Sequence, residues 1–258
     1  MPVPVSVLIV AADSGPSLRE CVTRALASSV PVELIIVDNG SRDGVPQALA
    51  PAFENDGRVR VLYNHANLGF GSAANVAAHA ARGDALLVLN PDCLLEPDSL
   101  ARMLEVLRVQ HGAGVVGAVV CDADGTPDPA SRRRDPLLRR SLNALTGRDR
   151  REAEDPSREG INVPGPVPDA VVETENVSGA LLLLPRNAFE RLQGFDEGYF
   201  LHCEDLDLCR RARDAGYRVL LAGNVRVHHG KGGSSRHRPG FVSWRKHRGM
   251  WRWFRKFD

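Results

Sequence analysis

The stretch NLGFGSAANVAAHAARGDALLVLNPD, residues 67–92, contains the two kinds of element that alternate through the first half of the chain. Its alanine-rich part, residues 72–81, predicts a helix, and the apolar run Ala85–Leu89 predicts a buried strand. The strand stops at Asn90-Pro91-Asp92, where the proline ends strand pairing and the aspartate is presented beyond the strand. That carboxylate either caps backbone amides in a turn or binds a hard cation such as Mg²⁺ or Mn²⁺.

The same alternation runs outward from this stretch over residues 5–120. The predicted strands are Val5–Val10, Leu34–Val37, Val59–Leu62, Ala85–Leu89 and Val115–Val120, and the helices between them are Leu18–Ala27, Val45–Phe53, Ser72–Ala81 and Ser99–Gln110. Because the strands are continuously apolar, we expect a mostly parallel sheet covered by helices on both faces, which is the α/β class.

Beyond residue 130 the pattern breaks. Residues 130–169 are rich in Arg, Pro and acidic residues with little apolar periodicity, which predicts a flexible loop or lid. Regular structure is expected again in the following segments: Val171-Val172, the apolar run in GALLLLP, helices near Asn187–Leu192 and Asp205–Ala215, and strands Arg218–Leu221 and Val225–His229. We therefore expect one catalytic domain over 1–235 and a basic, aromatic C-terminal helix over 236–258.

Composition excludes several classes of protein. The chain has 258 residues, 43% of them hydrophobic and 25% charged, which supports a globular core. Its five cysteines are odd in number and lack a CxxC pair, which argues against a disulfide framework and a zinc knuckle. The first apolar run, residues 5–12, is too short to span a membrane. These features predict a cytoplasmic protein.

The C-terminal segment GFVSWRKHRGMWRWFRKFD, residues 240–258, combines aromatic and basic residues. Phe241, Trp244, Trp251 and Phe254 recur at near-helical spacing among many arginines and lysines. Such a helix suits peripheral contact with an anionic membrane, here the inner face of the cell membrane. It can instead pack on the domain or on a second subunit as a homodimer. We do not expect nucleic acid as a partner.

Polar residues follow several of the predicted strands, at the edge where parallel sheets bind ligands. In VDNGSRDG, residues 37–44, Asp38 can accept a hydrogen bond from a pyrimidine N–H, with Asn39 and Ser41 nearby. The alternative is a turn at residues 38–40 with Ser41 or Asp43 capping the next helix. Residues 67–71 allow close backbone approach to a diphosphate at a helix N-terminus, although glycines there are common.

Two familiar nucleotide signatures are absent from the sequence. No GxGxxG follows the first strand, where AADSGP stands, and no GxxxxGK[ST] occurs. These absences argue against a dehydrogenase and a P-loop enzyme. If Asp92 does bind metal, His229 is a candidate second ligand, because Val225, Val227 and His229 share one strand face and the glycine-rich GKGGSS follows. A structural role for this histidine is the alternative.

Three acidic residues open the predicted helix in GYFLHCEDLDLCRRARDAG, residues 198–216. The helix dipole favours Glu204, Asp205 and Asp207 there without any chemistry. The apolar residues 199–201 just before them would instead partly bury one carboxylate and tune it as a general base. We expect Asp207 to be a surface residue or a structural partner.

Taken in order, four stretches resemble glycosyltransferase family 2, in its bacterial rhamnosyltransferase-like branch. They are VDNGSRDG, NLGFGSAANVAAHAARGDALLVLNPD, VSGALLLLPRNAFERLQGFDEGYFLHCEDLDLCRRARDAGYRV and VHHGKGGSS, and they cover roughly Val5 to Ser235 apart from the loop. The resemblance implies a GT-A fold, a nucleotide-sugar donor, a divalent metal and inversion at the anomeric carbon.

The resemblance also implies roles for individual residues. Asp38 would contact the base, Asp92 would be the last carboxylate of a DxD-type motif, and Asp205 in Glu204-Asp205 would be the catalytic base. His229 would complete the metal or diphosphate site, with His228 as the less favoured choice. The residues expected at the donor site are Ala11, Asp13, Asp38, Asn39, Ser41, Asn67, Gly69, Gly71, Asn75, Asn90 and Asp92.

The sequence departs from the family at two places. Ala11-Ala12-Asp13 stands where the family usually has a Tyr-Asn pair, and Asn90 replaces the first acid of the DxD motif. With one charge fewer, the site should hold metal weakly without the donor's diphosphate.

The function implied is a metal-dependent, inverting glycosyltransferase of surface polysaccharide synthesis. Its donor would be a dTDP-sugar such as dTDP-rhamnose, or a UDP-sugar, and its acceptor a glycan or a lipid-linked glycan. One rival is a sugar-nucleotide nucleotidyltransferase, which would need a basic, glycine-rich loop after the first strand, and AADSGPS has no Lys or Arg. The other rival is a non-catalytic, membrane-associated scaffold with the same fold.

Overall fold

The computed structural model describes residues 5–230 and 239–258. The glycine-rich residues 231–235, expected to keep the metal site open, lie outside this part of the chain.

Within the described residues, nine strands form one central sheet in the order β3-β2-β1-β4-β10-β6-β11-β5, with β8 added beside β11. The strands are β1 Val5–Ala11, β2 Val32–Asp38, β3 Val59–Tyr63, β4 Ala85–Leu89, β5 Cys93–Leu94, β6 Ala113–Cys121, β8 Val171–Glu173, β10 Leu181–Pro185 and β11 Arg218–His229. The pairs among β3, β2, β1 and β4 are parallel, as is β6 with β11. Strands β10, β5 and β8 run antiparallel to their neighbours. The predicted α/β class with a mostly parallel sheet is therefore confirmed.

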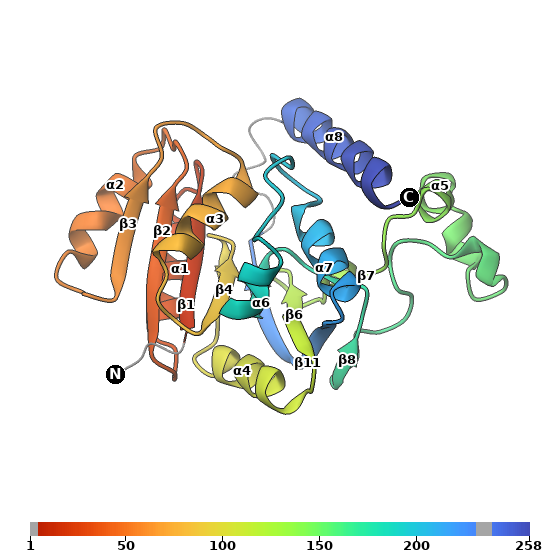
Figure 1. Ribbon diagram of the computed structural model, residues 1–258, viewed down its shortest axis with the longest axis horizontal. Helices are drawn as coiled ribbons and strands as arrows, with labels where there is room; N and C mark the ends of the chain where they lie inside the picture. Colours follow the sequence, from red (N-terminus) through yellow and green to blue (C-terminus); the bar gives the residue numbers. More distant parts are fainter. Residues whose placement is uncertain (1–4, 231–238) are drawn as a thin grey trace.

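Helices cover both faces of this sheet (Figure 1). On one face lie α1 (Ser17–Leu26), α2 (Val45–Leu49) and α4 (Ser99–Val109), and on the other lie α3 (Phe70–Ala80), α6 (Arg186–Arg191) and α7 (Glu204–Asp214). In β1, Val7 and Ile9 pack into the first layer while Leu8 and Val10 pack into the second. Burial on both faces explains why the strands are continuously apolar.

The strand order reverses beside β1, because β2 lies on one side of it and β4 on the other. Such a reversal opens a crevice at the carboxyl ends of the strands, since the connecting helices leave in opposite directions. In register, Ala11 at the end of β1 pairs with Asp38 at the end of β2, and Ile9 pairs with Leu89 at the end of β4. The predicted site residues that follow these strands are thereby brought to one edge.

The segment 130–169 is more regular than predicted. It contains 3₁₀ turns (Pro129–Ser131, Arg148–Arg151 and Pro156–Arg158), the short strand β7 (Arg132–Arg133) and helix α5 (Leu138–Thr146), and β7 pairs with β9 (Asn176–Val177). The expectation of a stretch without regular structure was therefore wrong. Ion pairs rather than an apolar stripe stabilise this segment, so hydrophobic periodicity gave no signal.

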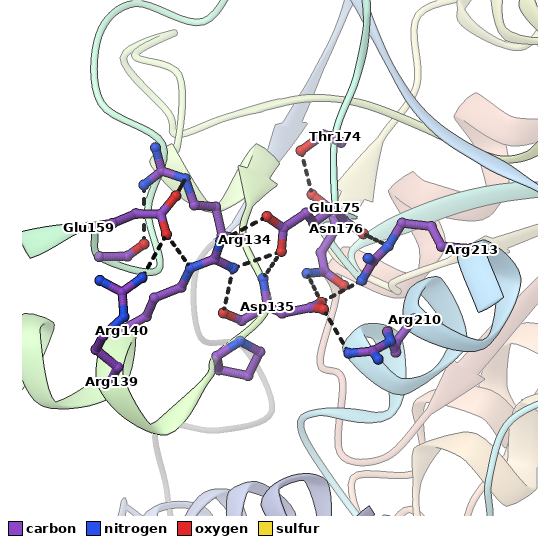
Figure 2. Close-up of polar contacts among 12 residues, drawn as sticks. Arg134, Asp135, Arg139, Arg140, Glu159, Thr174, Glu175, Asn176, Arg210 and Arg213 are labelled. Atoms are coloured by element: carbon purple, nitrogen blue, oxygen red, sulfur yellow. Dashed lines mark hydrogen bonds and ion pairs between the residues drawn. The ribbon is translucent and has the colours of Figure 1, made fainter. Parts of the chain in front are cut away.

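Asp135 lies at the centre of these ion pairs (Figure 2). Its buried carboxylate accepts hydrogen bonds from Asn176 (3.0 Å), Arg210 (3.2 Å) and Arg213 (2.5 Å). Arg210 and Arg213 belong to α7, so the segment is attached to the helix that carries the predicted base. Arg140 of α5 adds ion pairs with Glu159 and Glu175.

The C-terminal helix α8, Pro239–Phe257, packs along α7. Trp253 is fully buried against Tyr199 and Leu206, and the Lys256 ammonium lies 2.6 Å from the carboxylate of Asp207. Asp207 is therefore a buried structural partner and not a surface residue. No helix among the described residues has the length and apolar character needed to cross a bilayer.

Candidate functional site

The Asn90-Pro91-Asp92 turn faces the end of β11. Because β5 pairs antiparallel with β11 and Cys93 is opposite His229, the preceding Asp92 is brought against the imidazole. Asp92 Oδ1 lies 3.0 Å from His229 Nε2, and Asn90 Nδ2 lies 3.4 Å from the same nitrogen. His228 is exposed, with its Nδ1 3.4 Å from the Asp122 carbonyl oxygen. Of the two histidines, the structure places His229 at the turn.

This pair of side chains fits a divalent cation. Carboxylate oxygens and neutral imidazole nitrogens are both metal ligands, and here they converge on one point. Within the described residues, however, no three His, Cys, Asp or Glu side chains gather. An ion held by Asp92 and His229 would therefore need further oxygen ligands from water or a bound diphosphate.

Asn39 organises the glycine-rich loop before α3. Its buried side chain donates to Asn67 Oδ1 (3.1 Å) and to the Gly69 carbonyl (3.2 Å), and accepts from the Leu68 N–H (3.0 Å). Asn67 Oδ1 also accepts from the Gly69 N–H at 2.9 Å. These bonds use the amide of Asn39 internally, so its contribution to a ligand site is to shape the loop.

Asp38 takes part in the turn at residues 38–41, which was the alternative to a contact with a pyrimidine ring. Its Oδ1 accepts from the Ser41 N–H (2.8 Å) and its Oδ2 accepts from Gln47 Nε2 (2.7 Å). Each carboxylate oxygen can accept two hydrogen bonds, so the turn still leaves acceptor capacity for a ligand. The role of Asp38 toward a pyrimidine remains a prediction.

The end of β1 is tied to the same turn. Asp13, at a positive φ of 53°, accepts from the Arg42 N–H (2.6 Å) and donates its own N–H to Ser41 Oγ (3.3 Å). Ala11 is fully buried, and its carbonyl accepts from the Asn39 N–H at 2.8 Å. The side chain of Ala11 therefore packs in the core, and only its neighbours reach the sheet edge.

Gly69 and Gly71 are each required to be glycine, but for different structural reasons. Gly69 has φ of 88°, and a Cβ there would lie 2.6 Å from the Phe200 carbonyl oxygen, which accepts from the Phe70 N–H. At Gly71 a Cβ would instead lie 3.0 Å from Phe195 Cβ. Gly69 thus joins the loop to the segment before α7, whereas Gly71 serves packing against Phe195.

Asn75 was expected at the donor site, and the structure places it elsewhere. Its amide donates to the Phe195 carbonyl and to Glu197 Oε1, both at 3.0 Å, and accepts from the Phe195 N–H at 2.9 Å. The side chain is buried and its polar atoms are used. Asn75 is therefore a structural residue that holds the loop following α6, which corrects the prediction.

Glu204 and Asp205 open α7 after two residues, His202 and Cys203, that have positive φ. Glu204 is buried, and its Oε2 has no hydrogen-bond partner among the described residues. Burial, together with the charge of Asp205, raises the pKa of Glu204 to about 8. Near neutral pH Glu204 is thus protonated beside an Asp205 that pairs with a cation. Two neighbouring carboxyl groups in such different environments can take different roles, one as a neutral acid and the other as a charged base.

Asp205 is held by three donors. Its Oδ2 accepts from Arg133 Nη2 (2.7 Å) and from the Gly179 N–H (3.0 Å), and its Oδ1 accepts from the Leu206 N–H (2.9 Å). The residue after Gly179, Ala180, accepts the Asn90 N–H at 2.9 Å. Gly179 and Ala180 therefore hold the predicted base, Asp205, close to the turn that carries the predicted metal ligand Asp92.

Sequence reasoning missed Arg133 and Arg245. Arg133 belongs to the run SRRRDP, and three adjacent arginines before a proline were the only signal available. Arg245 of α8 stacks on Phe200 with its guanidinium carbon 3.8 Å from the ring centroid. The C-terminal helix thus contacts the segment that lies between the loop at Gly69 and the start of α7.

The fold and this edge site define a glycosyltransferase of the GT-A class, and solved structures share the fold. One is the mannosyltransferase PcManGT from Pyrobaculum calidifontis in complex with GDP-Man and Mn²⁺, with TM-score 0.65 and 21% identity. Another is GalNAc-T7 with UDP, GalNAc and Mn²⁺, with TM-score 0.65 and 16% identity. The matches cover 95% and 87% of this chain, which spans 60% and 42% of those two chains.

The model of the family described as Glycosyl transferase family 2 matches residues 6–165, and the chain belongs to this family. It is 32% identical over 255 residues to the N-acetylglucosaminyl-diphospho-decaprenol L-rhamnosyltransferase of Mycobacterium tuberculosis (strain CDC 1551 / Oshkosh), covering 90% of this chain and 78% of the relative. Rhamnosyltransferase WbbL of Escherichia coli (strain K12) is 29% identical over 162 residues, or 58% and 56% of the two chains. The rhamnosyltransferase-like branch and a glycosyltransferase activity are therefore confirmed, and the nucleotidyltransferase rival is excluded.

Proposed function

We propose that the protein transfers rhamnose from dTDP-rhamnose, with inversion and with Mg²⁺ or Mn²⁺, to a polyprenyl-linked glycan in cell-surface polysaccharide synthesis. The observation that carries the proposal is the Gly179-Ala180 backbone, which binds Asp205 through one residue and Asn90 through the next. The proposed base and the candidate diphosphate site are thereby adjacent, as a sugar transfer requires. The name of the mycobacterial relative supports the sugar and the lipid-linked acceptor.

The reaction is a direct displacement. The acceptor hydroxyl loses its proton to Asp205, and its oxygen forms a bond to the anomeric carbon of the donor sugar. The bond from that carbon to the diphosphate oxygen breaks, and its electron pair leaves with the nucleoside diphosphate. Attack opposite the leaving group inverts the anomeric configuration, and this route needs no covalent intermediate with the protein.

The residues that follow β4, together with His229 at the end of β11, serve the leaving group. Asp92 and His229, with Asn90 beside them, would hold a divalent ion that neutralises charge developing on the departing diphosphate. Glu204, neutral near pH 7, adds no second negative charge next to Asp205. The base therefore works beside a neutral neighbour and not beside a competing carboxylate.

Substitution of Asp205 by Asn tests the assignment of the base. The variant keeps the size of the side chain but cannot take a proton, so acceptor-dependent release of nucleoside diphosphate should fall about 10²- to 10⁴-fold. A matched control is Asp214→Asn on the same helix, where the carboxylate is exposed and pairs with Arg210. Unchanged release by the Asp205→Asn variant would mean that Asp205 is not the base.

The donor is tested by thermal shift with UDP-, GDP- and dTDP-sugars, each with and without Mn²⁺. Binding to the folded state alone raises the melting temperature, by an amount set by the ratio of ligand concentration to Kd. We expect dTDP-rhamnose with Mn²⁺ to give the largest shift. The donor-binding proposal fails if no sugar nucleotide stabilises the protein.

Contact with an anionic membrane is the part of the proposal that concerns location. On α8 the side chains of Phe241, Trp244 and Trp251 are exposed, whereas Phe254, expected in the same stripe, packs inward beside Trp253. Arginines lie between the exposed aromatic residues in the helix. Exposed aromatic rings among cations suit the headgroup region of an anionic bilayer.

Helix α5 carries a second set of exposed apolar side chains. Leu138, Leu142 and Leu145 lie on one side of α5 and are exposed, while Arg140 and Asn143 on the other side are buried. The first turn of α5 meets the end of α8, because the Leu138 N–H donates to Asp258 Oδ2 at 2.7 Å. A leucine stripe beside a basic, aromatic helix supports the proposal that both helices rest on the bilayer that holds the acceptor.

A further inference from the structure

Arg133 is the side-chain cation in direct contact with Asp205 among the described residues. Its Nη2 lies 2.7 Å from Asp205 Oδ2, and the two side chains are 22% and 13% exposed. A carboxylate so shielded loses hydration, and a cation within hydrogen-bond distance offsets that loss. The ion pair therefore concerns the one group that the proposed reaction needs in its ionised form.

The backbone around Arg133 is fixed relative to α7. In β7, Arg133 pairs with Asn176 of β9, and the next residue, Arg134, forms an ion pair with Glu152 at 2.7 Å. Asp135 follows and is bound by Arg210 and Arg213 of α7 (Figure 2). The guanidinium is thus anchored to the same helix that carries Asp205, so its placement is built into the fold.

The hydrogen bonds of Asp205 leave one oxygen open. A carboxylate can accept about four hydrogen bonds, two on each oxygen. Arg133 and Gly179 both donate to Oδ2, whereas within the described residues only the Leu206 N–H donates to Oδ1. The remaining acceptor position is therefore on Oδ1, which is the atom available to receive the proton of an acceptor hydroxyl.

Other titratable groups near Asp205 do not replace this cation. Glu204 and Cys209 of α7 and Cys203 before it have pKa values raised mainly by burial, so they are neutral near pH 7. Burial lowers the pKa of His202, and Lys246 from α8 adds to this effect. The charge that faces Asp205 from β7 is thus carried by Arg133.

We infer that Arg133 is a positioning residue for the base: together with the Gly179 N–H it occupies Oδ2 of Asp205, and it leaves Oδ1 to take the acceptor proton. This inference rests on the proposed function. It gives one residue of the segment 130–169 a role in the reaction, because Arg133 delivers the guanidinium to Asp205.

Steady-state kinetics of Arg133→Ala, with Arg132→Ala as the matched control, tests the inference. Arg132 precedes it on the same strand but donates to the carbonyls of Pro164 and Pro166. For Arg133→Ala we expect kcat to fall at least about 10-fold with little change in donor KM.

Two further measurements separate positioning from folding. Added guanidinium chloride at millimolar concentration should partly restore kcat of Arg133→Ala and have no effect on Arg132→Ala. Arg133→Gln, which keeps a donor but no charge, should show the same fall in kcat with little change in donor KM if the alanine variant does not fold.

The inference is overturned if Arg133→Ala, or Arg133→Gln in its place, keeps the wild-type kcat. It is equally overturned if kcat rises, since Arg133 would then block the base. Either result leaves the proposed function intact provided that Asp205→Asn remains inactive. Full activity of Asp205→Asn would instead show that Asp205 is not the base, which removes the assignment on which the inference rests.

Discussion

Asp92 and His229 face each other across the β5–β11 pairing, with 3.0 Å between the carboxylate Oδ1 and the imidazole Nε2. The two residues come from opposite halves of the chain, and the turn at Asn90-Pro91-Asp92 brings them together. Both side chains are largely shielded from solvent, at 14% and 18% exposure. Their contact converts a carboxylate at a strand end, ambiguous by itself, into half of a candidate cation site.

Asp92→Asn and His229→Ala should each abolish the Mn²⁺-dependent part of donor stabilisation. Each variant removes one of the two ligands that the protein offers, and the donor diphosphate alone would hold the ion weakly. The measurement is the melting-temperature shift given by dTDP-rhamnose with and without Mn²⁺. His228→Ala is the matched control, because that imidazole is exposed and turned toward Asp122. A metal-dependent shift that survives both substitutions would place the ion elsewhere.

Glu204 should make the protein less stable as the pH rises. Its pKa is about 8 in the folded protein and near 4.5 when exposed, so between these values the unfolded chain releases a proton that the folded chain keeps. The contribution of Glu204 to the free energy of unfolding is therefore greatest below pH 4.5, and it is lost progressively as the pH rises toward 8. The full change is on the order of a few kcal/mol.

Glu204→Gln, which is neutral at every pH, should remove this dependence. Urea unfolding at pH 5 and pH 8.5 measures it: the variant should gain stability relative to wild type between the two conditions. Glu190→Gln serves as the control, since that side chain is 64% exposed. If wild type and Glu204→Gln lose the same free energy of unfolding over this interval, the buried carboxyl does not titrate as stated.

Much of the fold follows from the sequence because both sheet faces are covered. Continuous apolar runs such as Leu34–Val37 predicted strands, and the helices between them were predicted within a few residues. The direction of β10 was not predictable, because an apolar run reads the same for a parallel or an antiparallel strand. One long strand, β11, replaces the two predicted ones, since its irregularity between Ala222 and Arg226 does not end the pairing.

The sequence predicted those site residues that follow a strand. It did not predict those whose role depends on contacts with residues far along the chain. Asp92 and His229 came from strand position and alternation, and the structure brings them together. The hydrogen bonds of Asn75 to residues 195–197 depend on the placement of a distant loop, which local patterns do not encode. Arg133 was missed for the same reason, because its partner Asp205 lies far along the chain.

Gly69→Ala should destabilise the protein more than Gly15→Ala. Both glycines have positive φ, which costs an alanine on the order of 1 kcal/mol, but a Cβ at Gly15 meets nothing within 4 Å. At Gly69 the Cβ would lie 2.6 Å from the Phe200 carbonyl oxygen, so the loop must move. The excess loss, measured by urea unfolding, reports this clash. Equal losses in the two variants would show that the close approach to Phe200 does not exist in solution.

Substitutions of the two tryptophans Trp251 and Trp253 of α8 should affect different properties, membrane contact and folding stability respectively. Trp253 is fully buried among Tyr199, Leu206 and Phe257, so Trp253→Ala should cost about 3–5 kcal/mol of unfolding free energy. Trp251 is 64% exposed on the same helix, and Trp251→Ala should change stability by no more than about 0.5 kcal/mol. Urea unfolding of the two variants measures this difference.

Binding to vesicles that contain anionic phospholipid should depend on the exposed side chains and not on the buried tryptophan. Trp251→Ala should weaken sedimentation with these vesicles, because the ring that enters the headgroup region is removed. Leu145→Asp on α5 should weaken it as well, since that leucine is 83% exposed and lies on the same proposed surface. Neutral vesicles serve as the control, because the arginines of α8 gain attraction only from anionic lipid. Wild-type sedimentation by both variants would show that neither helix rests on the bilayer, and a second copy of the chain would become the better partner for these exposed side chains.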